Sequence, residues 1–127
     1  MDNRTKQLEI IRPVITIENK KASALELFQN KTLRPILKFQ NDLIIAVFTH
    51  YLAEHKIKMR LLTDEKKEAF IHSVLKKNLQ VKNLLIGLIV GHFTVEELLF
   101  YFNAKNELNK RMVELLIKRL FDQKEKL

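Results

Sequence analysis

The chain of 127 residues contains no cysteine and no tryptophan, and it has only two glycines and two prolines. Without cysteine the protein has no disulfide, thiolate metal site, cysteine nucleophile or iron–sulfur cluster, and it fits a reducing compartment. β-Sandwiches and barrels need many tight turns, which draw on glycine and proline. The composition therefore favours long helices, and we expect a cytoplasmic protein.

Long apolar runs are also absent. The longest, Leu84–Gly91, is far shorter than the roughly 20 residues of a membrane-spanning helix. The N-terminal segment MDNRTKQLEIIRPVITIENKK lacks the apolar run of a signal peptide. We expect a soluble chain that does not contact membranes.

Sequence signatures of catalysis are missing as well. Gly87 and Gly91 are the only glycines, which excludes a P-loop, a GxGxxG fingerprint and a GxSxG elbow. His50 and Glu54 have a helical i,i+4 spacing that suits a metal, but two ligands do not make a site. We therefore predict no catalytic residue, no metal site and no cofactor.

Hydrophobic residues make up 46% of the chain, which is enough for one core at this length. Apolar residues follow helical spacing in most of the sequence. The expected helices cover residues 24–30, about 32–54, 64–79, 80–91, 95–102 and 107–124. We predict an all-α domain, a single compact bundle of five or six helices at residues 22–127. An extended arm at residues 1–21 should precede it, because its segment Ile10–Ile17 is β-branched and interrupted by Pro13.

Helix boundaries are marked by polar caps. The predicted N-caps are Ser23, Thr32, Thr63 or Asp64, and Thr94. Capping boxes are expected at Ser23, with Glu26, and at Thr94, with Glu97. Gly91 is expected to end the most apolar helix. The segment Asn103–Asn106 is a predicted turn, because asparagine tolerates left-handed geometry.

The net charge is +8, from 23 basic and 15 acidic residues. Acid-first i,i+4 pairs in the last helix (Glu107–Arg111, Glu114–Lys118 and Asp122–Lys126) are expected to be solvated surface. Three other segments have few acids: Lys31, Arg34 and Lys38; Lys56, Lys58 and Arg60; and Lys76, Lys77 and Lys82. If they converge, they form an anion-binding surface. The alternative is a basic surface that only keeps the protein soluble.

The region Phe93–Phe121 has the outline of a helix-turn-helix. Its pattern resembles AraC-type regulators at Val95–Leu98, Asn106, Leu108 and Arg111. The resemblance implies that Lys105, Asn106, Asn109 and Lys110 face nucleic acid, where amides and cations read base edges. The sequence departs from that family at Leu99, where the family has a small residue, and only one such unit is visible. The alternative is an ordinary helical hairpin in a bundle.

Gly87 and Gly91 lie four residues apart on the most apolar helix, where they would let another backbone approach closely. We expect Gly91 to act as a C-cap and Gly87 to make a tight core contact, with the seam of a homodimer as the alternative.

The segments 31–54 (KTLRPILKFQNDLIIAVFTHYLAE) and 82–98 (KNLLIGLIVGHFTVEEL) resemble a family of small bacterial helical proteins. Members of this family are sometimes labelled glyoxalase-related, or AraC type. The first label implies a metal-dependent lyase built from βαβββ units, but this sequence lacks the strands and the alternating His and Glu ligands. We predict a non-enzymatic binding module that forms a homodimer, with a nucleic-acid-binding regulator and a glyoxalase-related enzyme as the alternatives.

Overall fold

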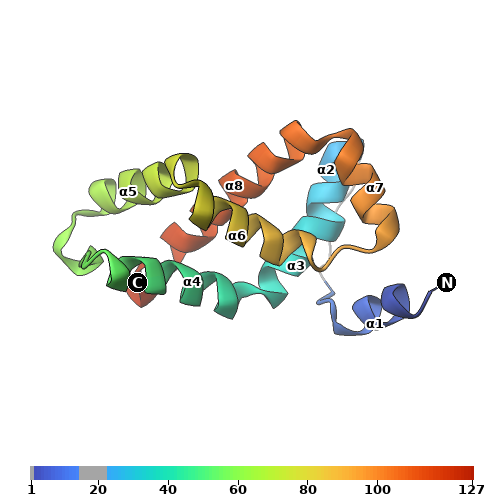
Figure 1. Ribbon diagram of the computed structural model, residues 1–127, viewed down its shortest axis with the longest axis horizontal. Coiled ribbons are helices and arrows are strands. Elements are labelled where there is room, and N and C mark those ends of the chain that lie inside the picture. The colour runs from blue at the N-terminus through green and yellow to red at the C-terminus, as the bar shows by residue number, and fades with distance from the viewer. Residues whose placement is uncertain (1, 15–22) are drawn as a thin grey trace.

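A computed structural model of the protein describes residues 2–14 and 23–127, and the secondary structure of these residues is helical (Figure 1). The helices are α1 (Asn3–Ile11), α2 (Ala24–Phe28), α3 (Arg34–Phe39), α4 (Asn41–Glu54), α5 (Asp64–Lys77), α6 (Leu79–Val90), α7 (Val95–Asn103) and α8 (Lys105–Asp122). A π-helical turn, η1 (Gln29–Leu33), joins α2 to α3, and short 3₁₀ turns lie at Met59–Leu61 and Lys124–Lys126. The predicted all-α class is confirmed.

The described helices outnumber the five or six that were predicted, for two reasons. The first is that the predicted helix over residues 32–54 is divided at Gln40, which lies between α3 and α4. The Gln40 side chain is buried and donates a hydrogen bond from Nε2 to the Leu88 carbonyl of α6 at 2.9 Å. The break is therefore stabilised by a contact between segments that are distant in sequence.

The second reason is α1, which replaces part of the predicted extended arm. Asp2 caps this helix by accepting a hydrogen bond from the Thr5 amide at 2.7 Å. Only Leu8 of α1 is buried, so apolar packing contributes little to holding the helix. The extended arm was wrong for residues 3–11 because polar contacts, and not β-branching, decide their conformation. Arg12, which follows α1, is extended as predicted, and residues 15–17 of the β-branched segment lie outside the described residues.

Three of the four predicted N-caps are confirmed. The side chains of Ser23, Thr63 and Thr94 accept hydrogen bonds from the first turns of α2, α5 and α7, and Thr94 forms a capping box with Glu97. The prediction of Thr32 as an N-cap was wrong, because the backbone continues through η1 from α2 into α3 and no helix begins there that needs a cap. Thr32 is buried instead, and its hydroxyl is used elsewhere.

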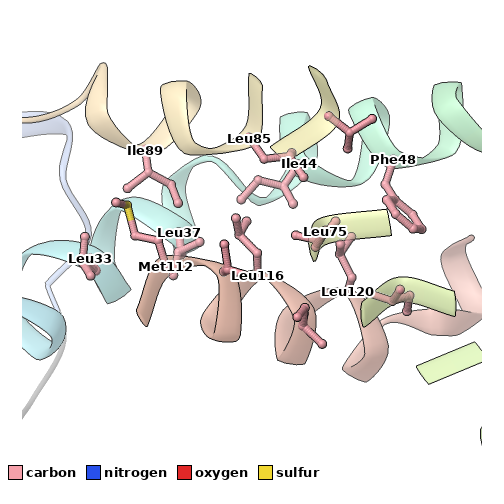
Figure 2. Packing of buried hydrophobic residues seen from close by; sticks show 14 of the residues in the cluster. Leu33, Leu37, Ile44, Phe48, Leu75, Leu85, Ile89, Met112, Leu116 and Leu120 are labelled. Atoms are coloured by element: carbon pink, nitrogen blue, oxygen red, sulfur yellow. The ribbon is translucent and has the colours of Figure 1, made fainter. Parts of the chain in front are cut away.

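The hydrophobic core is built around α8, the longest helix. Six of its apolar side chains are buried: Leu108, Met112, Val113, Leu116, Ile117 and Leu120. They pack mainly against α5 and α6. Figure 2 shows Ile89 of α6 pointing toward Met112 of α8. Burial of each such side chain stabilises the fold by about 1.5–3 kcal/mol.

The most apolar helix, α6, is buried along one face only. It buries Val81, Leu85 and Ile89, but Leu84 on its other side is 54% exposed. A Cβ built on Gly87 would meet no atom within 4 Å, so the predicted core contact of Gly87 is wrong. Gly91 follows the last residue of α6 as predicted, although its φ of −59° is ordinary right-handed geometry. Within the described residues, no helix is both long enough and apolar enough to cross a membrane.

Replacing Gly87 by alanine should stabilise the protein by about 0.5–1 kcal/mol, because glycine in a helix interior costs backbone entropy and the methyl group meets open space. Urea unfolding followed by circular dichroism measures this change. Gly91→Ala is the matched control and should give no gain, since its Cβ would lie 3.0 Å from the Gly87 carbonyl oxygen. A destabilised Gly87→Ala variant would contradict the open space around Gly87.

Candidate functional site

Glu97 is the centre of a polar cluster that we call the Glu97 clasp, formed by Arg12, Thr32, Thr94 and Glu97. The Arg12 guanidinium donates to both carboxylate oxygens, from Nη1 to Oε2 at 2.8 Å and from Nη2 to Oε1 at 2.9 Å. The Thr32 hydroxyl donates to Oε2 at 2.8 Å and the Thr94 amide to Oε1 at 2.9 Å. One carboxylate thus joins α1, η1 and α7.

Arg4 of α1 and Arg12, which follows that helix, also hold the loop after α6. Arg12 Nη2 donates to the His92 carbonyl at 2.7 Å. Arg4 Nη2 donates to the carbonyls of Gly91 at 2.7 Å and Phe93 at 3.0 Å. Cations are favourable at the carboxyl end of a helix, where these carbonyls lie. Because the charge of Glu97 is matched by Arg12 and its oxygens are hydrogen-bonded, the clasp is a structural element and not a ligand site.

The clasp shifts two pKa values. Burial acts to raise the pKa of Glu97, but the hydrogen bonds from Arg12, the Thr94 amide and Thr32 together bring it below its ordinary value. Burial, and then the charges of Arg12 and Arg4, lower the pKa of His92. Both groups therefore resist protonation in the folded protein.

Two basic hollows lie along α8. The first, which we call the lysine–asparagine groove, lies where the end of α5, the start of α6 and the start of α8 meet. Its volume is about 330 Å³, and it is lined by Lys76, Lys82, Asn106, Asn109 and Lys110, with Leu75 and Val113. None of the lining residues carries a carboxylate. The Tyr101 hydroxyl donates to Asn109 Oδ1 at 2.5 Å, which orients that amide.

The lysine–asparagine groove brings together residues from two predicted sites. Asn106, Asn109 and Lys110 came from the helix-turn-helix interpretation, and Lys76 and Lys82 from the acid-poor segments. Lys77 lies in a different hollow, beside Tyr51 and Phe70. Lys105 is exposed at the first residue of α8, outside the groove lining.

The helix-turn-helix outline itself is wrong. The predicted turn Asn103–Asn106 does not form, because α8 begins at Lys105 and only Ala104 separates it from α7. The motif needs a turn of about three or four residues to set the angle between its helices. The two helices contact each other inside the bundle, and the buried face of α8 packs mainly on α5 and α6.

The second hollow, which we call the arginine groove, lies between α3 and α8 on the other flank of α8. It has a volume of about 410 Å³. Four cations line it: Arg34 and Lys38 from α3, and Lys118 and Arg119 from α8. The other lining residues are Leu37, Leu115, Asp122 and Gln123. Asp122, the one carboxylate among them, lies 3.2 Å from Lys118 Nζ.

The predicted anion-binding surface is divided by the fold. Arg34 and Lys38 do converge, but Lys31 is exposed outside the groove, because η1 shifts the helical register on which the predicted stripe depended. Lys56, Lys58 and Arg60 are exposed beyond the far end of α4, a helix of about 20 Å by its length. The six predicted cations thus form no single surface.

Lys118 and Arg119 were not among the predicted anion-binding cations. Lys118 was expected to pair with Glu114 on the solvated surface, whereas it pairs with Asp122 in the structure. The predicted pair Glu107–Arg111 is present, with Arg111 Nε 3.5 Å from Glu107 Oε1. The spacing of residues on α8 alone contains no signal that α3 adds two more cations beside Lys118 and Arg119.

The side chains that could bind a metal do not cluster in the described residues. His50 Nε2 lies 3.2 Å from Glu54 Oε1, and both side chains are mostly exposed. Among the residues that the structure describes, no three His, Asp or Glu side chains are grouped as metal ligands would be. Residues 2–14 and 23–127 also contain no strand from which a βαβββ unit could be built.

Comparison of the chain with models of protein families, with curated proteins and with solved structures finds no match in any of the three.

The Glu97 clasp should make the protein sensitive to acid. A carboxyl whose folded pKa lies below its unfolded pKa adds stability above the unfolded pKa, near 4.5, which is lost as the pH falls through the folded pKa. His92 acts in the same direction, beginning below its ordinary pKa of 6.5.

Glu97→Gln should lower the stability at pH 7 by about 1.5–3 kcal/mol, because the charged partner of Arg12 is lost. It should also flatten the decline of stability below pH 4.5. Urea unfolding at a series of pH values measures both effects. Glu96→Gln, at the exposed neighbouring position in the same helical turn, is the matched control. An acid profile of Glu97→Gln that is identical to the wild type would contradict the clasp.

Proposed function

We propose that this protein is a non-catalytic helical module that binds nucleic acid through the lysine–asparagine groove. One observation supports the proposal above the others. Three ammonium groups, from Lys76, Lys82 and Lys110, line one groove together with two side-chain amides, and no carboxylate lines it. Like charges that share a groove repel each other, and a bound polyanion relieves this repulsion.

The chemistry of the groove suits a phosphate backbone more than a small metabolite. A lysine ammonium acts on phosphate as a point charge and requires no fixed geometry, so three lysines can follow a chain of phosphates. The net charge of +8 adds a long-range attraction for the same ligand. Because Asn109 Oδ1 accepts from Tyr101, its Nδ2 group is oriented to donate to a ligand oxygen or a base edge.

The binding mode proposed here differs from that of a recognition helix. The inner face of α8 is in the core, and only its first turns contribute Asn106, Asn109 and Lys110 to the groove. Such a short contact fits a phosphate backbone better than the floor of a major groove. We therefore expect binding with little sequence preference, since contacts to phosphate position a nucleic acid but do not read it.

The test is fluorescence anisotropy of labelled duplex DNA, single-stranded DNA and RNA at a series of salt concentrations. For a duplex, log K should fall with log salt by about 0.9 for each phosphate that is neutralised. The triple variant Lys76→Gln, Lys82→Gln and Lys110→Gln should bind more weakly, with a slope reduced by up to about three such contacts. Lys56→Gln, Lys58→Gln and Arg60→Gln remove the same charge outside the groove. Equal losses in both variants, or no binding at low salt, would overturn the proposal.

The homodimer is a separate part of the proposal. Val95, Leu99 and Phe102 follow i, i+4, i+7 spacing on α7 and are 56%, 57% and 57% exposed, which supports this face more than that of Gly87 as the contact with a second copy. Sedimentation velocity should show a dimer that Leu99→Lys dissociates and Leu84→Lys, on α6, leaves intact. The reverse result would favour the predicted glycine seam, and a monomeric wild type would remove the homodimer.

A further inference from the structure

The arginine groove differs from the lysine–asparagine groove in its cations. Two of the four are guanidinium groups, held in place by neutral side chains. Arg119 Nη1 donates to Asn41 Oδ1 at 3.1 Å, and Arg34 Nε donates to Asn30 Oδ1 at 3.0 Å. Each contact orients a planar fork and leaves its charge unneutralised. Among the described residues, neither arginine forms a salt bridge.

Asn41 is itself fixed by Gln123, the residue that follows α8. Its amide and that of Gln123 form a reciprocal pair, with Asn41 Nδ2 donating to Gln123 Oε1 at 2.8 Å and Gln123 Nε2 donating to Asn41 Oδ1 at 2.7 Å. The pair joins the start of α4 to the residue after α8. The Arg119 side chain is thereby held by Asn41, whose amide is itself fixed by Gln123, so the site is organised before any ligand arrives.

The charges of the groove are poorly compensated. Four cations line it, and the only lining carboxylate, Asp122, is paired with Lys118. Arg34 lies close enough to Arg119 to add to the effect of burial in lowering the pKa of Arg119, against the raising effect of Asp122. Two guanidinium groups that remain charged beside each other are stabilised by a multiply charged anion between them.

The size and the apolar part of the groove define the rest of the ligand. A volume of about 410 Å³ is that of a small-molecule pocket. Leu37 and Leu115 also line it, which provides apolar contact beside the cations. A planar guanidinium matches the oxygens of phosphate in a bidentate contact, and a phosphomonoester carries about −1.5 to −2 charges at neutral pH.

The two grooves cannot form one continuous track. With 3.6 residues per turn, Asn106, Lys110 and Val113 lie on one flank of α8, whereas Leu115, Arg119 and Asp122 lie on the opposite flank. The buried face of α8 lies between the two flanks on one side, and the acidic residues Glu107 and Glu114 lie between them on the exposed side. A ligand of the arginine groove is therefore separate from a nucleic acid bound at the lysine–asparagine groove.

We propose that the arginine groove is a binding site for a small phosphomonoester with a compact apolar group, whose phosphate lies between Arg34 and Arg119. Lys38 completes the charge around the phosphate, and the apolar group lies against Leu115. This site does not depend on nucleic-acid binding at the other groove.

The experiment measures the binding of phenyl phosphate to the full chain, by calorimetry and by ¹H–¹⁵N and methyl NMR. We expect saturable binding with shifts at Leu115 and the Gln123 side-chain amide, tighter for phenyl phosphate than for inorganic phosphate or sulfate. Arg34→Gln should weaken it by about tenfold or more, the usual effect of losing a charged hydrogen bond. Lys38→Gln, at a second exposed position, should weaken it less.

The controls separate a built site from general attraction of anions. Lys31→Gln removes a cation one turn away on the same helical segment but outside the groove, and it should leave the affinity unchanged. Lys76→Gln, in the other groove, should also leave it unchanged. Equal effects of Arg34→Gln and Lys31→Gln, equal affinity for sulfate and phenyl phosphate, or displacement by an oligonucleotide at much lower concentration would each overturn the proposal.

Discussion

The burial of one face of α8 determines where the polar groups of this protein can meet. Six apolar side chains of that helix lie in the core, at about 1.5–3 kcal/mol each. To cover them, α5 and α6 pack on one side and the segment from α2 to α3 approaches on the other. The long polar side chains at the two borders of this face keep their stems on the protein and their charges in water. The two basic grooves are therefore at the flanks of α8.

Polar clusters of two kinds result from this arrangement. In the Glu97 clasp a carboxylate and a guanidinium neutralise each other, and neutral donors complete the hydrogen bonds. Such a cluster holds segments together, as the clasp does for α1 and the loop after α6. The arginine groove also contains hydrogen-bonded arginines, but these are held by neutral amides. Orientation without neutralisation distinguishes a group that can take a ligand from one that only stabilises the fold.

The π-helical turn η1 shows how a local change of geometry directs side chains. It inserts into a continuous helical segment and directs Gln29 toward Arg111 and Thr32 toward Glu97. With an ordinary register, Lys31, Arg34 and Lys38 would share one stripe, as the sequence predicted. π-Turns are often found near functional sites, and here the turn contributes Thr32 to the clasp and leads directly into α3, which carries Arg34 and Lys38 of the arginine groove.

Local signals in the sequence were sufficient for the all-α class, the three confirmed caps, the capping box of Thr94 and the ion pair Glu107–Arg111. Each depends on residues within four positions of one another, where helical geometry alone decides the contact. The convergence of Arg34 with Arg119, the pairing of Arg12 with Glu97 and the break at Gln40 depend on segments that are about 50 to 90 positions apart. Only the packed bundle decides them, because the position of each charge depends on which helices cover α8.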